Sequence, residues 1–142
     1  FGIPALNRHI FMGDATQSIE KEIQCDKVDV LKVGHHGSDS STSSEFLNMI
    51  KPTYAIISAG NNANYNHPAE RVLQRLKDAN IQENNIYITK NQGTIWIKSD
   101  GKSIDIQTRK DINLDGTGQI SKLDIFNICS FFNHTNCSLL VC

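Results

Sequence analysis

Strand-like and helix-like segments alternate along the first 107 residues of the 142-residue chain, and this alternation limits the fold more than any other feature. Runs rich in β-branched and aromatic residues are typical of strands. Segments with an apolar residue every three or four positions are typical of amphipathic helices. The predicted strands are residues 8–12, 28–33, 53–59, 86–89, 94–98 and 103–107, and the predicted helices begin near residues 16, 42 and 68. The pattern predicts an α/β domain that ends in a β-meander.

The second predicted helix has a clear start signal. Thr42 and Glu45 have the spacing of a capping box, in which the side chain of each residue bonds the free backbone N–H of the other. An apolar stripe follows, and Pro52 is expected to close the helix.

Charge and composition argue against two classes of protein. The chain has 14 basic and 15 acidic residues, and the resulting formal charge of −1 argues against a strongly basic nucleic-acid groove. No apolar run reaches the roughly 18–20 residues that a membrane-spanning helix needs, so we expect no membrane span. The four cysteines have no metal-binding spacing, and reduced thiols are preferred to a Cys137–Cys142 disulfide.

Three groups of chemically active residues follow predicted strands. Asp14 could bridge two cations, although it is also placed to cap the next helix. His35 and His36 lie between glycines directly after a buried-type strand, and neutral imidazole is a leading ligand of zinc and manganese. His67 precedes a proline at a predicted helix start, where backbone N–H groups favour anions. A helix cap explains Asp14 alone and a surface cap position explains His67 alone, whereas a metal site is preferred to a surface turn for the histidine pair even by itself. Because strand exits gather at one edge of a sheet, we expect a shared metal-and-anion site.

Four segments of the chain resemble the C-terminal half of the metallo-β-lactamase domain in ComEC-type competence proteins and in similar secreted hydrolases. They are FMGDAT, VDVLKVGHHGSDSSTSSEFL, KPTYAIISAG and NYNHPAERVLQRL. The resemblance implies that residues 1–107 form the C-terminal half of a four-layer αββα sandwich with a two-metal site, zinc first and manganese second. Asp14 would bridge the ions, and His35 or His36 would ligate one of them while the other supports the ligands or contacts substrate. His67 would line the same cleft.

The family's main metal-binding motif lies upstream of the matched segments. It has the form His-x-Asp-x-Asp-His or His-x-His-x-Asp-His and does not occur in these 142 residues. Since each ion needs about three protein ligands, we expect the missing N-terminal half of the domain as a partner and an incomplete active site in this chain. The complete protein would hydrolyse phosphodiesters of nucleic acid or nucleotides, or related esters, with a metal-activated hydroxide. His67 would stabilise developing charge or protonate the leaving group. A degenerate, non-catalytic domain is the alternative that a start codon just before Phe1 would indicate.

Residues 108–142 are predicted to be a short appendage with a helical calcium loop. The calcium ligands would be Asp111, Asn113, Asp115, Thr117 and Asp124, the last after an insertion of two residues. The segment DINLDGTGQISKLDIFNI resembles one dockerin repeat of bacterial extracellular proteins, and a polar linker explains it equally well. The resemblance implies calcium, a cohesin-like protein partner and an extracellular or cell-surface location. It also gives the second function considered: a non-catalytic module that binds calcium and a protein partner.

Overall fold

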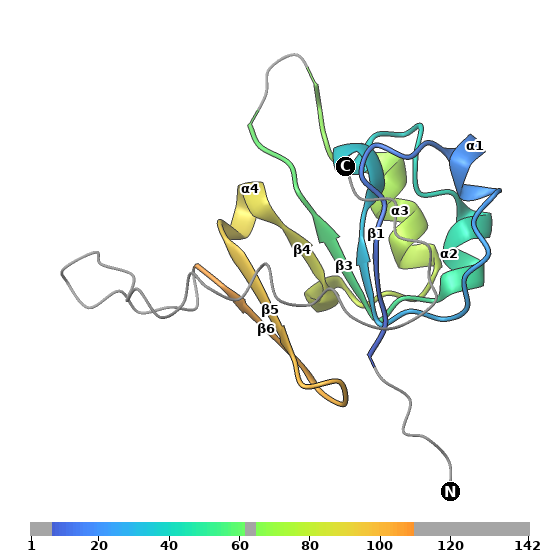
Figure 1. Cartoon of the computed structure of the whole chain (residues 1–142). Coiled ribbons are helices and arrows are strands. Elements are labelled where there is room, and N and C mark those ends of the chain that lie inside the picture. The colour runs from blue at the N-terminus through green and yellow to red at the C-terminus, as the bar shows by residue number, and fades with distance from the viewer. Residues whose placement is uncertain (1–6, 62–64, 110–142) are drawn as a thin grey trace, which may run out of the picture.

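The computed structural model describes residues 7–61 and 65–109 and is built around a parallel sheet (Figure 1). The sheet has four strands in the order β1-β2-β3-β4. The strands are β1 His9–Phe11, β2 Val30–Lys32, β3 Tyr54–Ile57 and β4 Ile86–Ile88. Neighbouring strands pair in parallel, with His9 opposite Val30 and Lys32 opposite Ile56. The carboxyl ends of all four strands therefore meet at one edge of the sheet.

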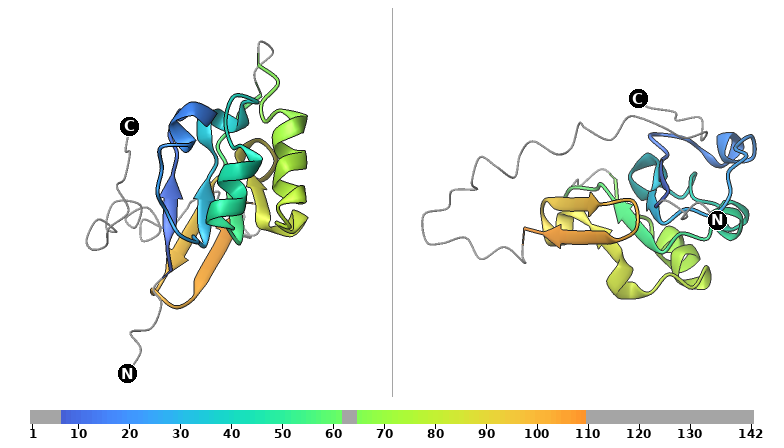
Figure 2. Two further views of the ribbon diagram at one scale, coloured as in Figure 1. Left: turned by 90° about the vertical axis from the view of Figure 1, so that its right-hand side faces the viewer. Right: turned by 60° about the horizontal axis from the view of Figure 1, so that its bottom comes forward.

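Helices connect the strands and cover one face of the sheet. They are α1 Gln17–Glu20, α2 Ser44–Ile50, α3 Glu70–Asp78 and α4 Thr89–Gln92, with short 3-10 turns η1 Gly34–Gly37 and η2 Glu83–Asn85. Figure 1 and the turned views in Figure 2 place α1, α2 and α3 together on one side of the sheet. Helix α4 instead leads from β4 into the final hairpin.

The final hairpin forms a sheet of its own. Strands β5 Ile95–Ser99 and β6 Ile104–Thr108 pair in antiparallel and lie on the side of the main sheet that the helices leave open (Figure 2). The Asn7 side chain ties the hairpin to the start of β1, because its amide donates to Ser99 Oγ at 3.1 Å and to the Ser103 carbonyl at 2.9 Å.

These pairings confirm the α/β class and correct the predicted meander. Residues 86–88 pair in parallel with β3 rather than with the strand that follows them, so only the last two predicted strands form an antiparallel unit. The four-layer αββα sandwich stays a prediction, as does the boundary between residues 107 and 108. The proposed calcium ligands, residues 111–124, lie outside the described residues.

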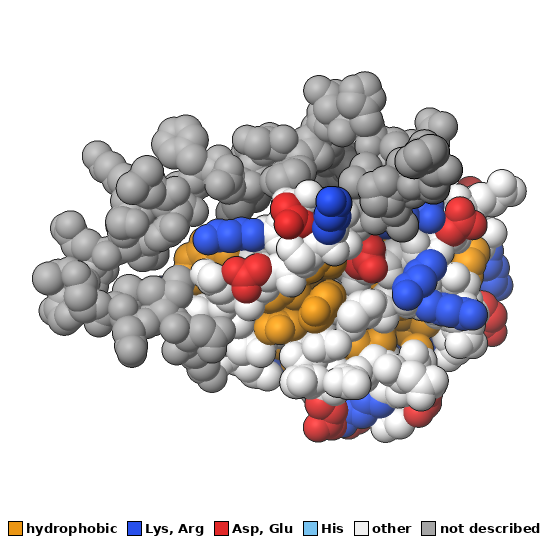
Figure 3. Space-filling view, turned by 90° about the horizontal axis from the view of Figure 1, so that it is seen from below, with side chains coloured by type: hydrophobic (Ala, Val, Ile, Leu, Met, Phe, Trp, Pro, Cys, Tyr) orange, Lys and Arg blue, Asp and Glu red, His pale blue; other side chains and the backbone are white. Residues whose placement is uncertain are grey.

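The hydrophobic core lies between the sheet and its helices. It includes Leu31, Val33, Ala55 and Ile57 from the strands and their ends, and Leu47, Ile50, Val72 and Leu76 from α2 and α3. Burial of such side chains contributes about 1.5–3 kcal/mol each relative to exposure. The apolar residues of the hairpin are only partly buried, and hydrophobic side chains are visible across the lower face in Figure 3. No helix in residues 7–61 and 65–109 has the length and apolar character to cross a bilayer.

Helix α2 begins one residue later than the predicted capping box. Ser43 is its N-cap, and the Ser43 hydroxyl accepts from the Phe46 N–H at 3.2 Å. Thr42 is buried with a left-handed φ of 57°. The carboxylate of Glu20, itself 2% exposed, accepts the N–H groups of Thr42 and Ser43. The carboxylate that serves the helix start therefore comes from α1 and not from Glu45, which is exposed.

Replacing Glu20 with alanine should lower the free energy of unfolding by about 2–4 kcal/mol, because two buried N–H groups would lose their acceptor. Urea denaturation followed by circular dichroism measures this loss. The matched control is Glu22→Ala, which removes an exposed carboxylate and should change the free energy by less than about 0.5 kcal/mol. Equal losses in both variants would contradict the role given to Glu20.

Candidate functional site

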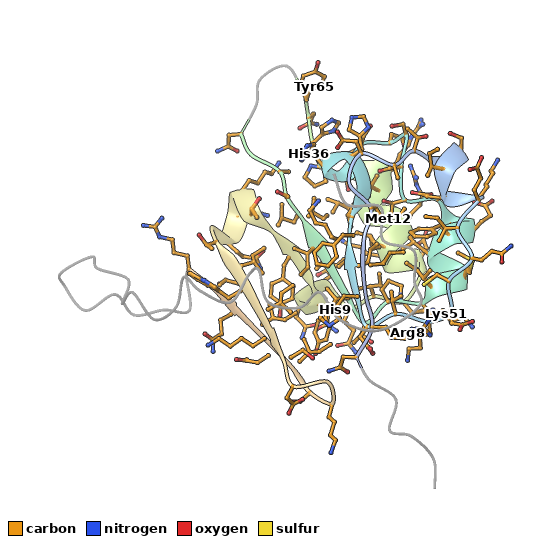
Figure 4. The ribbon with its side chains drawn as sticks, in the orientation of Figure 1. Arg8, His9, Met12, His36, Lys51 and Tyr65 are labelled. Atoms are coloured by element: carbon orange, nitrogen blue, oxygen red, sulfur yellow. The ribbon has the colours of Figure 1, made fainter. Side chains whose placement is uncertain are left out.

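The predicted site residues lie on loops at the carboxyl edge of the sheet. Asp14 follows β1, His35 and His36 form η1 directly after β2, and His67 lies between β3 and α3. In Figure 4, His36 and Tyr65 lie toward one end of the molecule, while Arg8 and His9 lie at the other. Parallel strand direction alone thus brings segments far apart in sequence to one edge.

His36 is the histidine that faces Asp14. Its Nε2 lies 3.9 Å from Asp14 Oδ1, and its Nδ1 lies 2.6 Å from the Ser58 carbonyl oxygen. Because a carbonyl only accepts, Nδ1 must carry the proton, which leaves Nε2 unprotonated in the neutral ring and turned toward the carboxylate. Metal-ligating histidines are commonly oriented in this way, with the second nitrogen bound to a backbone carbonyl. Both side chains are accessible, with 55% of His36 and 76% of Asp14 exposed.

His35 faces a different neighbour. Its Nδ1 lies 3.3 Å from Ser40 Oγ, and its ring centroid lies 6.2 Å from that of His67. Its backbone N–H donates to the Gly13 carbonyl at 2.8 Å, which joins the histidine loop to the loop of Asp14. Asp14 and His36 therefore form one pair, and His35 and His67 form a second.

The histidine loop has an uncommon backbone. His35 and His36 both adopt left-handed conformations, with φ of 46° and 55°. Each such residue costs about 1–3 kcal/mol and persists only where the surroundings impose it. Clusters of this kind are typical of functional sites, and here they turn two adjacent imidazoles toward different partners.

Two glycines hold this backbone in place. A Cβ on Gly34 would lie 2.9 Å from the Ala15 carbonyl oxygen, and one on Gly37 would lie 2.6 Å from Pro68 Cβ. Gly37 also has φ of 79°, and its carbonyl accepts from the Ala69 N–H at 2.8 Å. The loop is therefore packed between the segments that carry Asp14 and His67.

Arg75 on α3 supports the end of the same loop. Its guanidinium donates to the carbonyls of Ser41 at 2.8 Å and Thr42 at 3.0 Å, and it pairs with the Asp39 carboxylate. Ser40, the partner of His35, lies within this braced segment. Arg75 could not be predicted from the sequence, because an arginine on a helix gives no signal of a contact to a loop some 34 residues earlier.

Lys32 is a second residue of the site that the sequence pattern did not predict. It is the last residue of β2, and its Nζ donates to the Val33 carbonyl at 3.0 Å. Burial lowers the pKa of the Lys32 ammonium, and the nearby Asp14 carboxylate offsets part of that shift. Lys32 therefore interacts electrostatically with the Asp14 carboxylate.

His67 lies farther from a helix start than predicted. Helix α3 begins at Glu70 with Ala69 as its N-cap, so Pro68 precedes the first turn instead of belonging to it. The Nδ1 of His67 is buried and has no hydrogen-bond partner among residues 7–61 and 65–109. The His67 ring stacks on Tyr65, with centroids 5.7 Å apart and planes 19° apart.

The donors present fit part of a metal site. A tetrahedral ion with bonds of about 2.1 Å holds two donor atoms roughly 3.4 Å apart, so the observed 3.9 Å between Asp14 and His36 needs only a small closure. Within residues 7–61 and 65–109, no group of three or more His, Cys, Asp or Glu side chains is arranged to hold an ion. The described residues therefore supply two adjacent donors, and further ligands would have to come from elsewhere.

Comparison with known proteins finds similarity to competence proteins. Ninety residues, 61% of the chain, are 44% identical to ComE operon protein 3 of Bacillus subtilis (strain 168), of which they cover 11%. Fifty-three residues, 37% of the chain, are 45% identical to Competence protein ComA of Neisseria gonorrhoeae and cover 8% of it. Fifty residues, 35% of the chain, are 48% identical to Recombination protein 2 of Haemophilus influenzae and cover 6% of it.

These matches support the resemblance to ComEC-type competence proteins over this stretch. The chain spans between 6% and 11% of the length of these relatives. No family model and no solved structure matches it. The metallo-β-lactamase fold and the dockerin-like repeat stay predictions.

Gly37→Ala should lower the free energy of unfolding by about 2–4 kcal/mol, since the methyl group would meet Pro68 and the residue would remain left-handed. Chemical denaturation gives the loss, and NMR shifts of the His35, His36 and His67 rings report the displaced loop. Gly60→Ala is the matched control, because no atom lies within 4 Å of the added Cβ. It should stay within about 1 kcal/mol of the wild type, and a loss as large as that of Gly37→Ala would refute the packing argument.

Proposed function

We propose that this chain is part of a metal-dependent hydrolase that cleaves phosphodiester bonds of nucleic acid in a process related to competence. The relatives are named for competence and recombination, and these names support a substrate of nucleic acid and a process related to competence. The residues at the carboxyl edge of the sheet supply its chemistry.

The convergence of Asp14 and His36 is the observation that carries the proposal. These residues come from two loops 22 positions apart, and their donor atoms lie 3.9 Å from each other. The strained backbone at His36 and the Ser58 carbonyl that orients its ring indicate that this placement is imposed by the fold. A solvated pair of side chains would need neither.

The residues have distinct roles in the proposed reaction. Asp14 and His36 would hold one divalent ion, zinc first and manganese second, with further ligands from outside the described residues. Such an ion, when bound, activates water and polarises a phosphoryl oxygen. Lys32 adds positive charge beside Asp14, where an anionic substrate would approach.

His67 would act on the substrate by proton transfer or charge stabilisation. No hydrogen bond from residues 7–61 or 65–109 fixes the proton at its Nδ1, so these residues leave the tautomer of the ring open. The Lys90 Nζ, 3.2 Å from the His67 carbonyl, holds the segment and places a further cation close to it. Such a group typically contributes 10²- to 10⁴-fold to a rate.

In a protein that carries both this segment and the upstream motif, Asp14→Asn and His36→Ala should each weaken zinc binding about tenfold or more, because each removes one donor. Competition against a chromophoric chelator measures the affinity. Asp26→Asn is the matched control, since Asp26 is a carboxylate with 90% of its side chain exposed and pairs with Arg8, which lies at the other end of the molecule (Figure 4). Zinc affinities unchanged in both site variants would refute the proposed donors.

Catalysis is tested in a protein that carries both this segment and the upstream motif, identified by sequencing the gene before the codon for Phe1. His67→Gln should lower the rate of oligonucleotide hydrolysis by about 10²- to 10⁴-fold and leave zinc affinity within about threefold. Hydrolysis unaffected by His67→Gln would remove this histidine from the mechanism. An upstream region without the motif, together with no hydrolysis at added zinc or manganese, would refute the proposed activity.

A further inference from the structure

Tyr65 is the most exposed large hydrophobic side chain in the described residues, at 62%. A single exposed aromatic residue is common on protein surfaces and indicates nothing by itself. Tyr65 differs because its ring stacks on that of His67, with centroids 5.7 Å apart and planes 19° apart. A stacked ring covers one of its faces, and the exposure of Tyr65 shows that much of the rest is open to solvent.

The stack continues from Tyr65 into the candidate site. The His67 ring lies 6.2 Å from the ring of His35, at 52° to it. We call Tyr65, His67 and His35 the ring row. It runs from the exposed Tyr65 ring to His35 in the histidine loop. If a flat ligand stacked on the open face of Tyr65, only the Tyr65 ring would separate it from His67, the proposed proton donor.

The base of the ring row is held by the fold. The His67 carbonyl accepts from Lys90 Nζ at 3.2 Å. The next residue, Pro68, packs against Gly37, and the Ala69 N–H donates to the Gly37 carbonyl. The backbone that carries the His67 ring is thus anchored, while the Nδ1 of that ring has no hydrogen-bond partner among residues 7–61 and 65–109. A platform held in this way loses little conformational entropy when a second ring lands on it.

A nucleobase is the ligand that matches this platform. Exposed aromatic rings beside cationic groups are the usual means of binding single-stranded nucleic acid, because every base offers a π-face. One nucleotide carries both a flat base and a phosphate. The base would stack on the aromatic ring, and the phosphate would lie at the neighbouring site of metal donors and cations. Bases within a duplex already stack on their neighbours, so Tyr65 would favour an unpaired one.

We propose that Tyr65 stacks on an unpaired nucleobase of the substrate, next to the phosphodiester addressed by Asp14, His36 and His67. The inference rests on the proposed function for the identity of that phosphodiester. It adds a residue that selects single-stranded over paired substrate and that the metal chemistry does not require.

The test measures binding by the full chain in the presence of EDTA, so that no cleavage occurs. Fluorescence anisotropy at low salt gives the affinity for labelled oligo-dT and for the same strand with abasic residues. Tyr65→Ala should weaken oligo-dT binding between about 5- and 150-fold, the effect typical of losing one stacked base. Binding of the abasic strand should stay within about twofold. Tyr65→Phe keeps the ring and should match the wild type, as should Met49→Ala, which removes an exposed apolar side chain from α2.

Three results would overturn the stacking role: no binding of oligo-dT by the wild type, equal loss for both strands in Tyr65→Ala, or no loss for either. The result is independent of catalysis. Base-dependent binding that Tyr65→Ala abolishes, in a protein that cleaves nothing with zinc or manganese, would leave the stacking role standing and refute the hydrolase. Cleavage by the wild type, together with unchanged binding in Tyr65→Ala, would support the hydrolase and refute the stacking role.

Discussion

The candidate site depends on two close contacts at which the chain has room for glycine and for no larger residue. Gly34 lies against the Ala15 carbonyl and Gly37 lies against Pro68. These contacts fix both ends of the two-residue segment between them, and the left-handed conformations of His35 and His36 follow. The strain of that segment, about 1–3 kcal/mol per residue, is offset by packing on either side. The imidazoles are therefore placed by the scaffold before any ligand arrives.

The parallel sheet supplies the geometry within which those contacts work. Strands β1, β2 and β3 end at one edge, so the loops of Asp14, of the histidine pair and of His67 lie close together. Glu20, the last residue of α1, then bonds the start of α2, and Arg75 joins α3 to the end of the histidine loop. Both contacts satisfy backbone groups that would otherwise be buried without partners. Fold stability and site geometry thus rest on the same few polar contacts.

Local pattern was enough to predict the α/β class and most strands, because hydrophobic periodicity records which side of an element is covered. It failed where a distant residue decided the outcome. Thr42 and Glu45 have the spacing of a cap, yet the carboxylate of Glu20 takes the role and shifts the N-cap to Ser43. The pairing of β4 with β3 was missed for a similar reason, since short apolar strands carry no record of their partner.

The same limit applies to the site. The position of Asp14, His35, His36 and His67 after predicted strands indicated that they share one edge, but it could not say which histidine turns toward Asp14. Two adjacent residues in left-handed conformations project differently from two in a strand or helix, and that conformation is held by contacts of the loop with distant segments, among them the close packing of Gly34 and Gly37. Sequence spacing fixes a residue's position along the chain, whereas the direction of its side chain follows from contacts made elsewhere in the chain.

The described residues supply only two donors to the proposed metal ion, and this number limits how tightly they can bind it. An ion held by Asp14 and His36 alone would bind weakly, and each added ligand from another segment would raise its affinity. Metal binding and association of the segments that share the ion would then be linked. The free energy that the added ligands contribute to metal binding equals the free energy by which the ion stabilises the association. Because the histidine loop is already rigid, little of that binding energy would be spent on ordering this half of the site. Metal occupancy and assembly of the complete site would therefore rise together.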